Sequence, residues 1–325
     1  MSPHRCEPQN QGPSGPLLAV LDLGTNNCRL LIATPDGRDG FRVVDSFSRI
    51  VRLGEGIAQT GRLGEAALDR TIAALKVCAD RIKRHKVTRV RAIATQAARL
   101  AANADVLVAR ARDEAGLTLE VITAEAEADL AAIGCAPLIG RKYKGALVFD
   151  IGGGSTEIIW LEKTRHGVRK KFATSQALGV VTLAESGACG FAALRETIAA
   201  QFAPLAQQMQ GFDPARYHLL GTSGTVTTLA AIALKLPRYN RARVDGSWHQ
   251  SAHMLQVVDL LVGMTVEQLA QIGPIGPERA DLMLPGCAIF AAISALWPSP
   301  MIRVADRGLR EGMLRQLAAG SIETS

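Results

Sequence analysis

The chain has 325 residues, of which 48% are hydrophobic and 21% charged. This composition excludes a disordered or fibrous protein and provides enough apolar material for about two compact domains. Aromatic residues make up only 4% of the chain, too few for the base-stacking surfaces of single-strand nucleic-acid binders. We therefore expect no nucleic-acid partner, and the formal net charge of +7 favours an acidic or phosphorylated ligand instead.

The cysteines and the apolar runs indicate the cellular compartment in which the protein is expected. The 6 cysteines lie far apart with no C-x-x-C pair, which predicts reduced thiols of a cytoplasmic protein and neither a disulfide framework nor a structural zinc site. The longest apolar candidate, residues 284–297, contains Pro285 and Gly286 and falls short of the roughly 18 residues that span a bilayer. We expect a core helix there and no membrane association.

The first ordered element is expected at residue 17, because residues 1–16 are polar and rich in proline and glycine and predict a disordered tail. An apolar run then leads into Asp22, and a second apolar run covers residues 29–33. This pattern predicts a β-hairpin with a tight polar turn. The turn residues are Gly24, Thr25, Asn26 and Asn27.

Helices and strands alternate after this hairpin. Apolar residues spaced by three and four predict a helix over residues 68–82, and a strand follows at 88–94. Further elements are expected as a helix from about Gln96, a strand at 119–122 and a helix at 125–133. The turn-rich segment 134–145, with Pro137 as a helix stop, is expected to join two domains. Alternating strands and helices predict an α/β fold with helices flanking each sheet.

A second hairpin repeats the first about one domain length later. Its strands are expected at residues 146–151 and 158–161, and its first strand contains Asp150. Two related halves facing one another across a cleft would explain the repeat. The later part of the chain predicts a helix at 196–210, a strand at 218–220, a turn at 221–225 and a helix at 226–234.

The turn of the second hairpin has the composition of a phosphate-binding loop. Glycines at 152–154 let backbone N–H groups approach phosphate oxygens, and Ser155 and Thr156 add hydroxyl donors. A plain hairpin turn explains this segment equally well when it is taken alone. A phosphate-binding loop is favoured by the acids that lie nearby, Asp22, Asp150 and Glu157. Carboxylates beside a phosphate site require a cation, for which Mg²⁺ or alternatively Mn²⁺ is suited.

Other phosphate and catalytic patterns are absent or incomplete. The chain contains neither G-x-x-x-x-G-K-S/T nor G-x-G-x-x-G, and residues 221–225 do not fit the G-x-S-x-G turn of serine hydrolases. Those residues are better explained as a strand-to-helix turn in which Ser223, Gly224 and Thr225 hold another phosphate. His249 and His253 suit a metal pair on a helix, but no third ligand follows at a suitable spacing.

Basic residues gather in three runs, at 81–91, 163–171 and 238–243. Solvated surfaces explain the first run better than ligand binding does. The third run follows the turn at 221–225, so contact with a polyanion and simple solvent exposure remain equally open there.

Six segments together resemble the family of exopolyphosphatases and guanosine-pentaphosphate phosphohydrolases, within the actin-like superfamily. They are LDLGTN (21–26), ATQAAR (94–99), VITAEAE (121–127), DIGGGSTE (150–157), GTSGT (221–225) and ADRGLREG (305–312). The resemblance implies two actin-like (ribonuclease H-like) domains, each a mixed sheet flanked by helices, with a cleft between them. We assign residues 17–136 to the first domain and 137–304 to the second, and expect a C-terminal helix within 305–325 to complete the first. Longer family members have an additional C-terminal region, so the chain is similar to a short form.

The resemblance also implies roles for single residues. Glu127 would activate the attacking water, Arg99 would bind phosphate, and Asp150 and Glu157 would position a metal or water. Asp22 joins Asp150 and Glu157 as a third expected metal ligand. Thr95 and Arg99 are four residues apart at the start of a helix, so they share a face at an anion-favouring N-terminus. Asn27 departs from the family pattern, which has a hydroxyl residue there.

The activity that the resemblance implies is hydrolysis of a phosphoanhydride. The leading hypothesis is an exopolyphosphatase that releases terminal orthophosphate from inorganic polyphosphate through a Glu-activated water. The alternatives are removal of the 5′-γ-phosphate from guanosine pentaphosphate, an actin-fold kinase or ATPase in which residues 221–225 hold adenosine, and a non-catalytic sensor. The expected ligand is accordingly inorganic polyphosphate or a nucleotide of the (p)ppGpp type. A homodimer is left open by the sequence.

Overall fold

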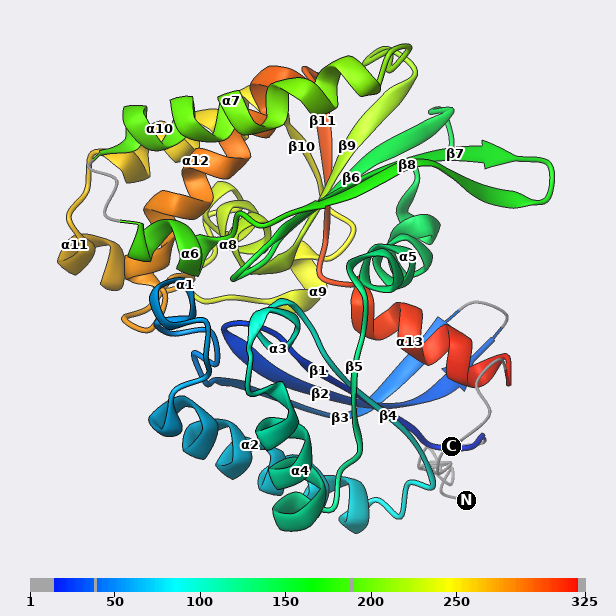
Figure 1. The fold of residues 1–325 in the computed structure, drawn as a ribbon. Helices are drawn as coiled ribbons and strands as arrows, with labels where there is room; N and C mark the ends of the chain where they lie inside the picture. The colour runs from blue at the N-terminus through cyan, green and yellow to red at the C-terminus, as the bar shows by residue number, and fades with distance from the viewer. Residues whose placement is uncertain (1–14, 38–39, 187–189, 321–325) are drawn as a thin grey trace, which may run out of the picture.

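The computed structural model describes residues 15–37, 40–186 and 190–320, in which two mixed β-sheets lie one above the other (Figure 1). Most of the predicted tail, residues 1–14, lies outside the described residues. The first sheet has the strand order β3-β2-β1-β4-β5. Its strands are β1 (Leu18–Leu23), β2 (Asn27–Asp36), β3 (Gly40–Ile50), β4 (Arg89–Ala94) and β5 (Leu119–Val121). Strand β4 pairs in parallel with β1 and β5, whereas β2 pairs antiparallel with both β1 and β3.

Helices cover both faces of the first sheet. Those of the first half are α1 (Ile57–Thr60), α2 (Glu65–Arg84), α3 (Gln96–Leu100), α4 (Ala104–Ala115) and α5 (Ala124–Cys135), followed by the 3₁₀ turn η1 (Ala136–Leu138). The predicted apolar stripe of α2, including Leu68, Ile72 and Leu75, packs with Leu107 of α4 under the sheet. The helix predicted at 68–82 is thereby confirmed, with slightly wider bounds.

The second sheet has the strand order β10-β11-β9-β6-β7-β8. Its strands are β6 (Gly145–Ile151), β7 (Thr156–Thr164), β8 (Gly167–Gln176), β9 (Tyr217–Thr222), β10 (Trp248–Gln250) and β11 (Met301–Ala305). Strand β9 is parallel to both β6 and β11, whereas β7, β8 and β10 are antiparallel to their neighbours. Each sheet therefore contains the predicted hairpin, β1–β2 in one and β6–β7 in the other.

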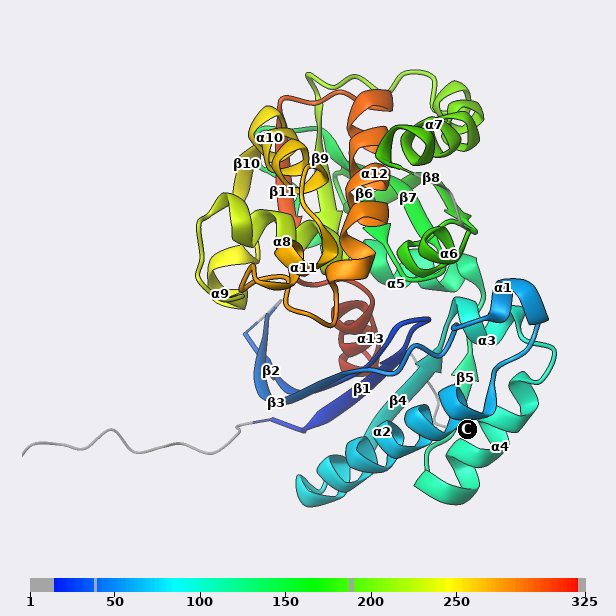
Figure 2. The ribbon, with the colours of Figure 1, turned by 90° about the vertical axis from the view of Figure 1, so that its left-hand side faces the viewer.

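The helices of the second half are α6 (Val180–Glu185), α7 (Phe191–Gln208), α8 (Ser223–Ala233), α9 (Arg241–Val244), α10 (Ser251–Val262), α11 (Val266–Ala270) and α12 (Ala280–Leu296). Helices α7 and α12 cover the outer face of the second sheet (Figure 2). Their residues Phe202 and Phe290 join Phe149 of β6 in the largest core. The apolar run at 284–297 is thus a core helix, as predicted. No described helix is both long and apolar enough to cross a membrane.

Helices α5 and α13 (Leu309–Ala318) lie between the sheets (Figure 1). Leu314 of α13 and Leu130 of α5 share one core with Val20 and Leu31 of the first sheet. Ala128 and Ala131, also on α5, pack against the inner face of the second sheet. The C-terminal helix therefore packs on the first sheet, although it directly follows the last strand of the second.

Several predicted elements differ from the structure. The turn expected at 221–225 does not exist as a separate element, because Thr222 ends β9 and Ser223 begins α8. His249 lies in β10 and His253 in α10, so these two residues do not share a helix. The helix predicted at 196–210 begins earlier, at Phe191, and contains Pro204. Strands β3 and β8 were not expected.

Candidate active site

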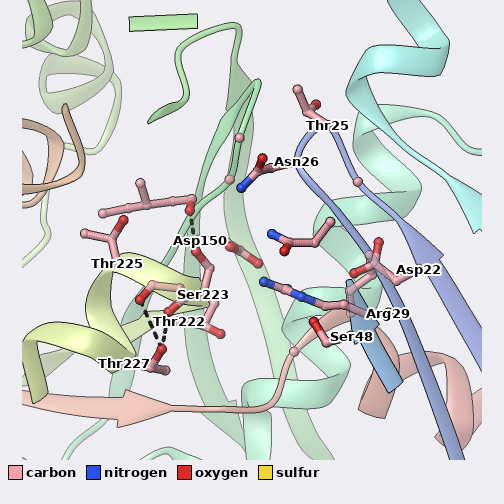
Figure 3. A pocket seen from close by; sticks show the side chains of 18 of the residues that line it. Asp22, Thr25, Asn26, Arg29, Ser48, Asp150, Thr222, Ser223, Thr225 and Thr227 are labelled. Atoms are coloured by element: carbon pink, nitrogen blue, oxygen red, sulfur yellow. Dashed lines mark hydrogen bonds between the residues drawn. The ribbon is translucent and has the colours of Figure 1, made fainter. Parts of the chain in front are cut away.

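A cavity of about 510 Å³ lies between the two sheets, lined by residues of both domains (Figure 3). Asp22 and Asp150 both line it, and each is the penultimate residue in the first strand of a hairpin. The strand register pairs Asp22 with Arg29 and Asp150 with Glu157. The two hairpins therefore direct carboxylates from opposite sheets into one space.

The turns of the two hairpins touch each other. A Cβ atom on Gly153 would lie 3.1 Å from the Thr25 Cβ, and one on Gly154 would lie 2.7 Å from the Thr25 Oγ1. Side chains at these two positions would separate the turns, so glycine permits the close approach. Backbone N–H groups of one turn thereby come next to the side chains of the other, as a shared phosphate-binding wall requires.

Glu127 is held by Arg99. The Arg99 Nη1 donates to the Glu127 Oε2 at 2.7 Å and to the Ile122 carbonyl at 3.1 Å, while its Nη2 donates to the Gln96 Oε1 at 2.7 Å. Burial and the negative charge of Glu157 raise the pKa of Glu127 well above its usual value, and Arg99 opposes that shift. A carboxylate with a raised pKa is a stronger proton acceptor, which suits a general base.

Glu157 and Asp150 form a second acidic group. The Glu157 Oε1 accepts hydrogen bonds from the hydroxyls of Ser155 and Ser175, both at 2.7 Å. Burial raises the pKa of Glu157, and the two hydroxyls lower it in part. Burial and the charge of Glu157 raise the pKa of Asp150 to about 7, although the positive charge of Arg29 opposes this. Burial and the repulsion between the acidic groups thus outweigh the effect of Arg29 on the pKa of Asp150.

The structure brings together most of the residues singled out from the sequence. The predicted residues that line the cavity are Asp22, Gly24, Thr25, Asn26, Asn27, Thr95, Glu127, Asp150, Gly152, Gly153, Gly154, Ser155, Glu157, Ser223, Gly224 and Thr225. Arg99 lies behind Glu127 and Gln96 and does not line the cavity itself. Thr156 is turned away, because its hydroxyl donates to the Leu178 carbonyl at 2.7 Å.

Four arginines that line the cavity were not singled out from the sequence: Arg307, which pairs with Asp245, and three others without an ion pair in the described residues. Arg29, Arg279 and Arg310 line the cavity from β2, from the start of α12 and from α13, and none forms an ion pair within the described parts of the chain. Arg29 lies between Asp22 and Asp150 (Figure 3). Burial, and then the charge of Arg29, lower the pKa of Arg279. Arginines that repel one another in a partly buried space favour a multiply charged anion.

The three basic runs differ in their contacts. In the first, Arg81 pairs with Asp45 and Arg91 with Glu120, which agrees with a structural role. In the second, Arg169 pairs with Glu162. In the third, Arg241 lines the cavity and donates to Glu311 at 2.7 Å, whereas Arg243 is exposed.

The donor set of the cavity fits a hard divalent cation. The Oδ1 atoms of Asn26 and Asn27 are buried and have no hydrogen-bond partner in the described part of the chain, and both residues line the same cavity as Asp22 and Asp150. In the described residues, no cluster of three or more His, Cys, Asp or Glu residues is arranged to hold a metal ion by itself. Mg²⁺ commonly binds through one or two carboxylates, with substrate phosphates and water completing its shell.

Two facing mixed sheets with flanking helices and a cleft between them define the actin-like two-domain class of proteins. Within that class, the chain belongs to the Ppx/GppA phosphatase family, whose model matches residues 31–319. A Mycobacterium tuberculosis protein named exopolyphosphatase 2 is 34% identical over 85% of this chain and 89% of its own length. The crystal structure of the Aquifex aeolicus family member is 28% identical, covers 95% of this chain and 99% of its own, and has a TM-score of 0.78.

A longer relative is also similar. The Vibrio parahaemolyticus protein named guanosine-5′-triphosphate,3′-diphosphate pyrophosphatase is 30% identical over 95% of this chain. The match covers only 60% of that relative.

Proposed function

We propose that the protein is an exopolyphosphatase, a phosphoric anhydride hydrolase that releases terminal orthophosphate from inorganic polyphosphate. The proposal rests on one observation above all: Glu127, which is held by Arg99, shares one cavity with both glycine turns and with three arginines that form no ion pair among the described residues. The family and the similarity to a protein named exopolyphosphatase 2 support it.

The residues in and around the cavity have different roles in the proposed reaction. A water oxygen attacks the terminal phosphorus, a new P–O bond forms, and the bond to the bridging oxygen breaks. Glu127 accepts the proton of the attacking water, and Arg99 holds that carboxylate toward the cavity. Backbone N–H groups of the two turns and the side chains of Arg29, Arg279 and Arg310 stabilise charge on the transferred group and on the shortened chain.

We further propose Mg²⁺ as the cofactor, with Mn²⁺ as an alternative. The expected ligands are Asp22, Asp150 and Glu157, of which one or two would bind the cation together with phosphate oxygens and water, since no three acids are arranged to hold it by themselves within the described residues. When bound, the cation neutralises part of the charge on the phosphate oxygens. Thermal unfolding tests this directly: Mg²⁺ together with inorganic phosphate should raise the Tm of the protein, and the increase should be lost in Asp150→Asn. An equal increase in both proteins would count against the assignment.

A substrate panel tests the activity. Release of orthophosphate should be followed with Mg²⁺ present for long-chain polyphosphate, guanosine pentaphosphate and ATP. We expect the highest kcat/KM with polyphosphate. Transfer of a labelled γ-phosphate to an acceptor other than water would favour a kinase, and binding of polyphosphate without release at any Mg²⁺ or Mn²⁺ concentration would favour a sensor.

Hydrolysis of guanosine pentaphosphate is the second candidate function, and one feature of the cavity favours it. Tyr239 lines the wall near α8 with 38% of its surface exposed, and Pro274, Leu282 and Met283 add apolar surface. An inorganic chain makes no use of apolar surface, whereas a nucleoside does. A higher kcat/KM for guanosine pentaphosphate than for polyphosphate would establish this candidate over the first.

A further inference from the structure

The segment of residues 51–56, which precedes α1, is bonded to the turn of the first hairpin. The Asn26 carbonyl accepts hydrogen bonds from the N–H groups of Val51 at 2.9 Å and Arg52 at 3.0 Å, and the Thr25 carbonyl accepts one from Gly54 at 2.9 Å. A Cβ atom on Gly54 would lie 2.3 Å from the Thr25 Cγ2. The segment and the turn are therefore held together as one rigid unit.

The same segment also reaches the second domain. The Arg52 Nη2 donates to the Asp281 Oδ2 of α12 at 3.0 Å, and the Gly56 N–H donates to the Glu185 Oε1 of α6 at 3.1 Å. Both views of the ribbon show α1 beside α6 (Figures 1 and 2). Two carboxylates of one domain thus hold a loop of the other.

Helix α6 is in turn bonded to the glycine turn of the second hairpin. The N–H of Val180 donates to the Gly152 carbonyl at 3.0 Å, and that of Val181 donates to the Gly153 carbonyl at 2.8 Å. A continuous set of contacts therefore runs from the first turn through residues 51–56 to α6 and into the second turn. Any rotation that opens the cleft beside these contacts must break those of Arg52 and Gly56 first.

Arg52, Glu185 and Asp281 do not line the cavity, so they do not act by touching the ligand. Arg52 has a backbone φ of 47°, a left-handed conformation that residues other than glycine seldom adopt. The bonds to Asn26 and Asp281 hold it in that conformation. Among the residues that the structure describes, one oxygen of each carboxylate, Glu185 Oε2 and Asp281 Oδ1, is buried without a hydrogen-bond partner. Burial of these oxygens costs free energy because they lose their hydration. The contacts of the two carboxylates across the domain boundary offset this cost.

We propose that Arg52, Glu185 and Asp281 form an interdomain clasp that holds the cleft closed and aligns the two phosphate-binding turns. They are positioning residues, since they act through the backbone of the turns. The kinetic part of this inference rests on the proposed function, but the structural part does not. A ligand that binds only the closed form has its apparent affinity reduced by the fraction of protein that is open.

Substitution of the clasp tests the proposal. Arg52→Ala and Glu185→Ala should each raise the KM for polyphosphate about three- to tenfold while kcat changes less than about twofold, because saturating substrate restores closure. Glu185→Gln keeps an oxygen acceptor for the Gly56 N–H and should retain most of the original KM. The exchange Arg52→Asp with Asp281→Arg should restore affinity relative to either single change. Arg62→Ala is the matched control, since this arginine is exposed and only six residues beyond Gly56.

Small-angle X-ray scattering provides a readout that does not depend on catalysis. The radius of gyration of ligand-free Arg52→Ala should exceed that of the unchanged protein, and added tripolyphosphate should reduce the difference. Equal radii together with an unchanged KM would overturn the clasp. A protein that hydrolyses nothing in the substrate panel but still shows the change in radius would overturn the proposed function and leave the clasp supported. Because the Arg52 and Asp281 side chains are 41% and 40% exposed, the variants are expected to fold.

Discussion

Glu127 and Glu125 stand two residues apart in the first turn of α5, yet their surroundings differ completely. The Glu127 side chain is 14% exposed and bonded to Arg99, whereas the Glu125 side chain is 82% exposed. The structure thus places in the cavity the acid that family resemblance favours. Glu125 lies at the surface, where its negative charge interacts favourably with the positive end of the helix dipole.

Glu127→Gln should reduce kcat by about 10²- to 10⁴-fold, because an amide cannot accept the proton of the attacking water. Glutamine keeps the size of the side chain and an oxygen for the Arg99 guanidinium, so the affinity for polyphosphate should be retained. The measurements are orthophosphate release at saturating substrate and calorimetric binding of tripolyphosphate. Glu125→Gln is the control on the same helix turn and should keep full activity; a kcat of Glu127→Gln within twofold of the original would exclude the assigned role.

His218 is a buried titratable residue remote from the hairpin turns, with a clear consequence for stability. Its Nε2 accepts from the Gly140 N–H at 3.1 Å and its Nδ1 donates to the Leu219 carbonyl at 2.8 Å, which requires the neutral ring. Burial lowers the pKa of His218 from 6.5 to about 4. Protonation would place a second donor opposite the N–H of Gly140.

The pH dependence of unfolding should therefore include a contribution from His218. Below pH 6.5 His218 becomes protonated in the unfolded chain, whereas in the folded protein it stays neutral down to about pH 4. Its contribution to the free energy of unfolding is therefore fully present above pH 6.5 and falls as the pH is lowered toward 4. The loss should reach about 2 kcal/mol at pH 5. Urea unfolding at pH 7.5 and pH 5 measures it. His218→Gln should remove this part of the difference, whereas the exposed His253, changed to Gln, should not; an equal difference in all three proteins would contradict the assignment.

At the residue scale, the site residues that belong to a repeated pattern or to a family motif were predicted from the sequence. Those that belong to neither were missed. Asp22 and Asp150 were predicted because each ends an apolar strand before a glycine-containing turn. Arg29 was missed, although strand pairing places it directly beside Asp22. A single arginine inside an apolar run carries no signal of its own until the register of the hairpin is known. Thr156 was included through its neighbours, and only the structure shows that its hydroxyl bonds Leu178.

At the scale of elements, the contact between α5 and α13 depends on two glycines. A Cβ atom on Gly312 would lie 2.0 Å from the Leu130 carbonyl oxygen, and one on Gly134 would lie 2.0 Å from the Gly308 carbonyl oxygen. The two helices therefore pack backbone to backbone. This contact fixes both the helix that presents Glu127 and the helix that presents Arg310.

Gly312→Ala should push these helices apart. We expect a loss of about 1–3 kcal/mol in the free energy of unfolding, as for overpacked sites, and a reduced kcat because Glu127 moves with α5. Chemical unfolding and orthophosphate release measure the two effects. Gly64→Ala is the control, because that glycine has a φ of −74° and nothing within 4 Å of the added Cβ. Unchanged stability in Gly312→Ala would show that the helices adjust without cost.

The elements missed from the sequence are those whose structure depends on their neighbours. Strand β3 is mostly exposed or half-buried and lacks an apolar run, so it is a strand because it pairs along the whole of β2. Strand β8 similarly depends on β7. The residues after Gly221 have the composition of a turn, but β9 runs directly into α8, and Ser223 takes a φ of 77° at the junction. Local composition cannot distinguish such a junction from a loop.

At the scale of the whole molecule, the cavity exists only because two distant halves of the chain meet. The repeated hairpin predicted that meeting, since two similar strand-and-acid patterns imply two similar domains. The contacts of residues 51–56 across the boundary could not be predicted. They depend on pairs of residues such as Arg52 and Asp281, which are far apart in the chain and are brought together by the completed fold.

The charge of the whole molecule predicts a dependence of binding on salt that differs between long and short ligands. Arg29, Arg279 and Arg310 line a partly buried cavity, where salt screens their charge only weakly. A long polyphosphate chain extends beyond the cavity over the surface of a protein with a net charge of +7, and those exposed contacts are screened within about 8 Å at physiological salt. Raising the salt concentration from about 0.05 to 0.5 M should therefore lower the affinity for long-chain polyphosphate by more than about tenfold and that for tripolyphosphate by only a few-fold.

Calorimetric titrations of both ligands against Glu127→Gln measure these affinities without turnover. Adding Arg29→Ala to that variant should lower the affinity for both ligands by a similar factor at every salt concentration, because it removes a contact inside the cavity. Equal salt dependence for the two ligands would mean that the long chain is bound only through its terminal phosphates.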